Sequence, residues 1–181
     1  MRTRIMCLAA VAMWTVGIIA QGTPNLSGTW TLDPVKTAAA SPAPPSGAGS
    51  GRVNTGGGIV SAGAVGAAGA AAEWVIAQTA TALTLTRAVA DGSTQKLVYK
   101  LDGSESVNVN GRTTQTTKTT ASAGKITTTG TQVVKTDQGD ITSQITEVRS
   151  LDKDGAMVVE TTRTFDESGS RTTTQVFVKR K

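Results

Sequence analysis

From Leu83 to the C-terminus, β-branched or apolar residues alternate with polar ones, most of them threonine. A period of two is typical of strands that bury one face and expose the other. Short turns rich in Gly, Asp or Ser interrupt the pattern about every 10–15 residues, which leaves no room for crossover helices. The sequence therefore predicts an all-β fold, an antiparallel meander of about eight to ten strands.

The turns between these strands carry recognisable dipeptides. Asp91-Gly92, Asp102-Gly103, Asn110-Gly111 and Asp154-Gly155 join residues that tolerate positive φ, and Ala123-Gly124 occupies an equivalent place between two threonine-rich runs. Such pairs favour tight connections between neighbouring antiparallel strands. We therefore expect consecutive strands to pair with one another as hairpins.

The N-terminus has the layout of a secretory signal peptide. Arg2 and Arg4 precede an almost uninterrupted apolar run, Ile5–Ala20, and polar, turn-forming residues follow. This three-part pattern predicts cleavage near Ala20 and export to the periplasm or beyond the cell. Cys7, the only cysteine, would leave with residues 1–20. No second apolar run of that kind follows, so we expect a protein that is not embedded in a membrane.

The composition changes abruptly between residues 38 and 72, which are almost entirely Ala, Gly, Ser, Pro and Val. A segment of this kind buries too little side-chain surface to offset the entropy lost on ordering it. We expect a long disordered insertion here. It would separate a first barrel strand within residues 21–37 from the rest of the barrel domain, residues 73–181.

The residue inventory excludes several functional classes. The chain has no histidine, and without Cys7 it has no cysteine, so catalytic triads and the usual zinc ligands cannot form. The remaining paired carboxylates sit in predicted turns beside glycine, where Asp caps its own backbone. A net charge of +5 with 3% aromatic residues does not suggest nucleic-acid binding. We expect no enzymatic activity, no metal and no cofactor.

Gly28-Thr29-Trp30, on the expected first strand, is the one motif of this sequence that resembles the motif of a known family. A Gly-x-Trp triplet ahead of an antiparallel meander resembles the lipocalin superfamily. The stretch Leu26–Asp33, together with Asp102-Gly103 and Val159–Phe165, is similar to secreted bacterial lipocalin-like proteins of unassigned function. The resemblance covers the first strand and residues 73–181, and it implies an up-and-down β-barrel.

The resemblance also implies how one end of the barrel is sealed. In lipocalins the matching tryptophan plugs the closed end, and an arginine from near the last strand packs across its ring, a favourable cation–π arrangement. This gives Gly28 and Trp30 a structural role. Arg180 suits the second role by position and Arg163 by strand pattern, and the sequence leaves both open.

An eight-stranded barrel is just wide enough to be filled by side chains or to hold one small ligand. The large inward-facing residues of the early strands would line such a lumen: Leu83, Leu85, Leu97, Tyr99 and Leu101. We therefore expect a carrier of a small apolar molecule. The alternative is a non-enzymatic structural or interaction protein of the cell envelope, with a filled core and a threonine-rich surface.

Overall fold

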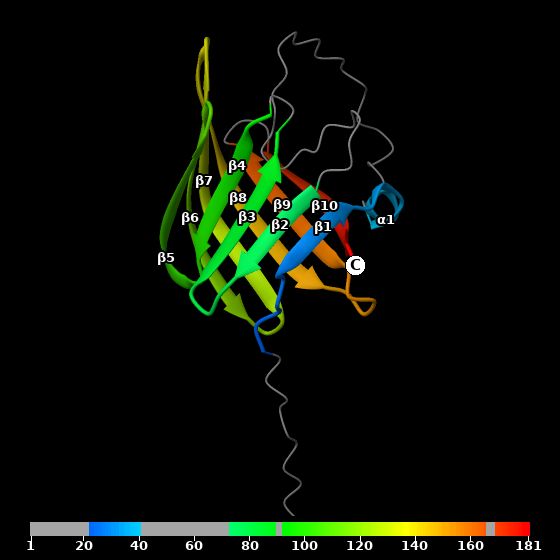
Figure 1. Cartoon of the computed structure of the whole chain (residues 1–181). Helices are drawn as coiled ribbons and strands as arrows, with labels where there is room; N and C mark the ends of the chain where they lie inside the picture. Colours follow the sequence, from blue (N-terminus) through cyan, green and yellow to red (C-terminus); the bar gives the residue numbers. More distant parts are fainter. Residues whose placement is uncertain (1–21, 41–72, 90–91, 166–168) are drawn as a thin grey trace, which may run out of the picture.

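The computed structural model describes residues 22–40, 73–89, 92–165 and 169–181. These residues form one antiparallel sheet of ten strands, curled into a barrel, and one short helix (Figure 1). In chain order the elements are β1 (Gly28–Leu32), α1 (Pro34–Ala40), β2 (Glu73–Gln78), β3 (Ala82–Ala88), β4 (Thr94–Lys100), β5 (Asp102–Asn110), β6 (Thr113–Ser122), β7 (Lys125–Thr136), β8 (Gly139–Leu151), β9 (Met157–Phe165) and β10 (Gly169–Lys179). The predicted all-β, up-and-down barrel is confirmed. The expected signal peptide, residues 1–20, and nearly all of the expected insertion lie outside the described residues.

The alternating pattern of the sequence becomes the two faces of this sheet. Along β4, exposed and buried residues alternate without exception. Threonines take buried positions on β6 and β7, where the hydroxyls of Thr119 and Thr128 lie 2.9 Å apart and share a hydrogen bond. Pairing two buried hydroxyls removes much of the cost of taking them out of water. Threonine can therefore fill part of the interior of this barrel.

The turn between β6 and β7, which the structure describes in full, falls where the sequence predicts it. Between β6 and β7, Ala123 and Gly124 have φ angles of 48° and 74°, and the flanking Ser122 and Lys125 pair directly. Two consecutive positive φ angles match the twist of antiparallel strands and are typical of a two-residue hairpin. The sheet consequently runs as a meander, with order β4-β3-β2-β1-β10-β9-β8-β7-β6-β5.

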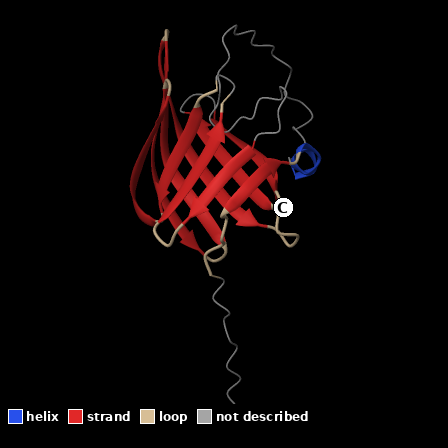
Figure 2. Ribbon diagram, viewed as in Figure 1, coloured by secondary structure: helices blue, strands red, loops and turns tan. Residues whose placement is uncertain are grey.

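The first and last strands, β1 and β10, lie side by side, so they connect β2–β4 with β5–β9 in one sheet. Trp30 of β1 pairs with Lys179 of β10 on one side and with Trp74 of β2 on the other. Figure 2 shows the strands wrapping around a common interior. The sheet edges that remain belong to β4 and β5, which follow each other in the chain.

Side chains close the seam between β4 and β5. The Asn108 side chain accepts a hydrogen bond from the Val98 amide through Oδ1 at 2.8 Å and donates one to the Val98 carbonyl through Nδ2 at 3.0 Å. Two residues along, Ser106 Oγ accepts a hydrogen bond from the Lys100 amide at 2.9 Å. The Asn108 amide thus makes the two hydrogen bonds that a peptide group of a neighbouring strand would make. The barrel is therefore nearly closed, although no backbone ladder joins β4 and β5 in the described residues.

A short helix, α1, follows β1; it begins within the segment expected to carry the first strand, residues 21–37, and ends within the first three residues of the expected insertion. Asp33 caps it through Oδ1, which accepts hydrogen bonds from the Val35 and Lys36 amides at 3.1 and 2.9 Å. Thr37 Oγ1 accepts a hydrogen bond from the Val176 amide at 2.9 Å and fastens the helix to β10. An Asp followed by Pro is a recognised start of a helix, since proline is pre-organised for the first helical position.

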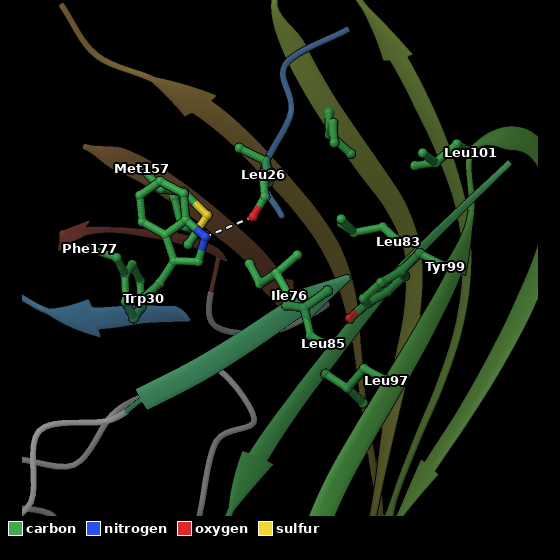
Figure 3. Close-up of a cluster of buried hydrophobic side chains, with 12 residues drawn as sticks. Leu26, Trp30, Ile76, Leu83, Leu85, Leu97, Tyr99, Leu101, Met157 and Phe177 are labelled. Atoms are coloured by element: carbon green, nitrogen blue, oxygen red, sulfur yellow. Dashed lines mark hydrogen bonds between the residues drawn. The ribbon is translucent and has the colours of Figure 1, made fainter. Parts of the chain in front are cut away.

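The interior changes character along the barrel. On β3 and β4 the inward pairs pass from Leu83 with Tyr99, through Leu85 with Leu97, to the polar pair Arg87 with Gln95. The larger apolar residues form one cluster around Trp30 (Figure 3). One part of the barrel is therefore a filled apolar core, while the next part along the strands brings polar side chains inside.

Candidate functional site

Trp30 anchors the apolar cluster, as the sequence predicts for a core residue. Its side chain is only 1% exposed. Its indole nitrogen donates a hydrogen bond to the Leu26 carbonyl at 2.7 Å, drawn as the dashed line in Figure 3. A buried indole usually needs such a partner, so this bond fixes the ring in one orientation. Trp30 is thus part of the packed core.

The cation over the Trp30 ring is a lysine. Lys179 Nζ lies 5.6 Å from the ring centroid, within the range of a cation–π interaction. The Lys179 stem passes close to Gly28, where an added Cβ would lie 2.5 Å from Lys179 Cε. Gly28 therefore serves this end of the barrel by leaving room for the lysine.

The expectation that Arg163 or Arg180 packs across Trp30 is wrong. The exposed Arg180 side chain instead pairs with Glu73 at 2.8 Å. Arg163 pairs in register with Arg171, eight residues along β10 from Lys179. At about 3.3 Å per residue, that places it about 26 Å along the strand from the Trp30 level. Side chains on a tilted sheet are placed by register, which sequence position alone did not reveal.

All five residues predicted to line the lumen are buried: Leu83, Leu85, Leu97, Tyr99 and Leu101. Leu85, Leu97 and Tyr99 border an internal cavity of about 50 Å³. All five belong to one apolar cluster. The structure therefore keeps the predicted set together in the core, and three of its members also face the cavity.

The opposite wall of the cavity carries an ion pair that the sequence analysis missed. Glu147 and Arg149 both point inward from β8 and border the cavity, and Arg149 Nη2 forms a salt bridge with Glu147 Oε1. The Arg149 guanidinium also lies 5.2 Å from the centroid of the Tyr99 ring. A signal existed, because Ile145 lies two residues before Glu147 and four before Arg149, so all three share one face of the strand.

Arg149 is the most deeply buried charged residue described, at 4% exposure. Its Nη1 atom is buried and has no hydrogen-bond partner among the described residues. A buried donor without a partner is costly, and more so when it belongs to a charged group. Arg149 therefore has binding capacity that the surrounding protein does not use.

A second arginine reaches the same cavity from β3. Arg87 stacks on the Trp74 ring at 4.8 Å and donates a hydrogen bond through Nε to Gln95 Oε1 at 2.6 Å. Burial lowers the pKa of Arg87 below its ordinary value. Gln115 and Gln175 add amide groups to the wall. The cavity thus combines an apolar side with a side rich in hydrogen-bond donors and acceptors.

Burial controls the ionisation of the phenol in this wall. It raises the pKa of Tyr99 to about 12, against the opposing attraction of the nearby Arg149. The phenol is therefore neutral across the ordinary pH range and retains its proton as a hydrogen-bond donor.

A larger hollow of about 470 Å³ lies on the surface between α1, the turn before β9 and the C-terminal residues. Its charged wall consists of Lys36, Asp154, Lys179, Arg180 and Lys181. All of these residues are exposed, so solvent screens their charges. The cavity in the barrel interior is the better candidate site because its wall includes Arg149 and Tyr99, which are only 4% and 3% exposed.

The described residues contain no group of three or more His, Cys, Asp or Glu side chains placed to hold a metal ion. Within the same residues, no helix has the length and apolarity that spanning a bilayer requires. No protein-family model matches the sequence, and no match is found among curated proteins. The lipocalin-like family therefore stays a prediction from the sequence, and the candidate site is argued from its geometry alone.

Proposed function

We propose that this protein is an exported, non-enzymatic binding protein of lipocalin type that holds one small molecule in the barrel lumen. The observation that supports it is the internal cavity, bounded by Leu85 and Leu97 on one side and by Arg149 on the other. A partly apolar hollow with a few convergent polar groups is the usual form of a small-molecule site. The apolar wall provides affinity and the polar wall provides orientation.

The size of the cavity limits the ligand. The cavity volume is about 50 Å³, so it has room for more than a single buried water, which needs about 10–15 Å³. Sites for drug-sized ligands are larger, about 300–1,000 Å³. The proposed ligand is therefore compact, with a short apolar part against the leucines.

Native mass spectrometry of protein purified from its own host tests this proposal. We expect a bound small molecule that denaturation releases, and a mature N-terminus at Gln21 if the export prediction holds. The matched variant is Leu97→Trp, which fills the cavity from its apolar wall and should remove the adduct. A homogeneous, adduct-free protein that also fails to bind any small probe in solution would end the carrier proposal.

One observation favours an alternative, a non-enzymatic interaction protein of the cell envelope. Val107 and Val109 on the outer face of β5 are 58% and 67% exposed. Exposed apolar residues that lie together on a strand can contribute to a protein interface. Replacing both with serine would impair this second function and leave lumen binding intact, whereas Leu97→Trp would have the opposite effect.

A further inference from the structure

We infer that the lumen ligand is a small monovalent anion, of the class of short-chain carboxylates, whose charged group binds Arg149. This inference rests on the proposed function and specifies its ligand. It derives from three features of the cavity: an unused buried donor, an excess of positive charge and a short apolar wall.

The unused donor is Arg149 Nη1. Because Nη2 is engaged by Glu147 and the guanidinium packs over Tyr99, the group is held in a fixed orientation. Nη1 is buried, and no group in the described part of the chain accepts a hydrogen bond from it. A carboxylate oxygen is a strong acceptor for a guanidinium, and such charge-assisted bonds are stronger than neutral ones. A ligand carboxylate would satisfy this donor at little cost in side-chain ordering.

The charge of the cavity wall favours an anion over a neutral or cationic ligand. Of the residues that the structure describes, three ionised ones border the cavity: Arg87 and Arg149 are positive and Glu147 is negative. The wall therefore carries a net charge of about +1, which a monovalent anion neutralises. The neutral phenol of Tyr99 adds a donor, since burial holds its pKa near 12.

The remaining wall suits a short alkyl chain. Leu85, Leu97 and Val159 border the cavity, and Phe177 closes it toward the Trp30 cluster. A space of about 50 Å³ suits a short carboxylate such as acetate or propionate better than a long chain, because it is far below the about 300–1,000 Å³ of sites for larger ligands. Each buried CH₂ adds about fourfold to affinity, so propionate should bind more tightly than acetate until the cavity is full.

An NMR titration of the ¹⁵N-labelled mature protein tests the inference. The probes are acetate, propionate and hexanoate, with propionamide and 1-propanol as uncharged analogues of similar size. We expect saturable shifts in β4 and β8 for propionate, with at least tenfold weaker effects for propionamide, since a charge-assisted bond is lost. Equal affinity for propionate and propionamide overturns the anion assignment.

Matched variants locate the binding group. Arg149→Met combined with Glu147→Gln removes both partners of the buried pair, so that neither is left without its counter-charge, and should weaken propionate binding at least tenfold. Arg112→Gln removes one positive charge from an exposed pair with Asp137 and should leave binding unchanged. Propionate binding that survives in the double variant, or in Leu97→Trp, also overturns the assignment.

The ligand panel separates this inference from the proposed function. If 1-propanol binds in the lumen and is blocked by Leu97→Trp while carboxylates do not bind, the carrier stands and the anion class fails. If no probe binds and the protein from its host carries nothing, both fail together.

Discussion

Raising the pH through the titration of Tyr99 should destabilise the folded protein. The Tyr99 side chain is 3% exposed, and burial raises its pKa to about 12. In the unfolded chain the phenol returns to its ordinary pKa of about 10. Between pH 10 and pH 12 the unfolded state has therefore lost a proton that the folded state still holds. The contribution of neutral Tyr99 to the free energy of unfolding is therefore fully present below pH 10 and is lost as the pH rises from 10 to 12.

The size of this loss follows from the shift. One pKa unit corresponds to about 1.4 kcal/mol, so a shift of about two units corresponds to about 3 kcal/mol of unfolding free energy. A small domain has about 5–15 kcal/mol in total, so a loss of this size shifts the midpoint of urea unfolding clearly.

Tyr99 is the only tyrosine in the chain, so tyrosinate absorbance reports on this residue alone. We expect a titration midpoint near 12 for the folded protein and near 10 in denaturing urea. Urea unfolding of the parent protein and of Tyr99→Phe at matched pH values isolates the coupling, because lysines titrate in both proteins. A folded-state midpoint near 10, or an identical loss of stability in the Phe variant, would refute the reasoning.

Three further predictions concern stability and are all read from urea unfolding curves. Trp30→Ala empties the largest fully buried site among the described residues and should cost about 3–5 kcal/mol, while a loss below about 1 kcal/mol would contradict the predicted role of Trp30 in sealing the barrel. Asn108→Ala leaves two backbone groups of β4 unpaired at the seam, so it should cost about 1–3 kcal/mol and speed amide exchange there. Its control is Asn110→Ala, at the exposed end of β5, which should change the stability little. Gly130→Ala would place a Cβ 2.7 Å from the Thr117 Cα of β6 and should cost about 3 kcal/mol. The neighbouring, exposed Thr129→Ala should have a negligible effect. A Gly130→Ala protein of unchanged stability would show that β6 and β7 can separate without penalty.

Much of the fold could be predicted because its signals are local. Strict alternation over residues such as Thr94–Lys100 determines which side chains face inward, and dipeptides such as Asn110-Gly111 mark the reversals between strands. The buried leucines of β3 and β4 follow from the same rule. The position of Arg163 could not be predicted this way, because it depends on the register between β9 and β10 and on the stagger of the whole barrel.

The candidate site was predicted only on its apolar side. Leu85, Leu97 and Tyr99 stand out as large residues in a chain with few of them. Glu147 and Arg149 look like ordinary surface charges, since charged residues are rarely buried unless paired. The ion pair of Glu147 and Arg149 on β8 meets Tyr99 of β4 only because the sheet curls into a barrel. A contact between strands so far apart in the sequence could not be predicted from local patterns.

On β5, polar side chains face the barrel interior and valines face outward, the reverse of the usual arrangement. This follows from the way the barrel closes. Ser106 and Asn108 must face inward, because their side chains supply the hydrogen bonds that the β4 backbone lacks across the seam. Successive residues of a strand point to opposite faces, so this choice forces Val107 and Val109 outward. Their exposure is thus a consequence of closure even before any partner is invoked. A barrel closed at this seam by a regular backbone ladder would free β5 to bury its valines, and the outward apolar pair would then have no structural cause.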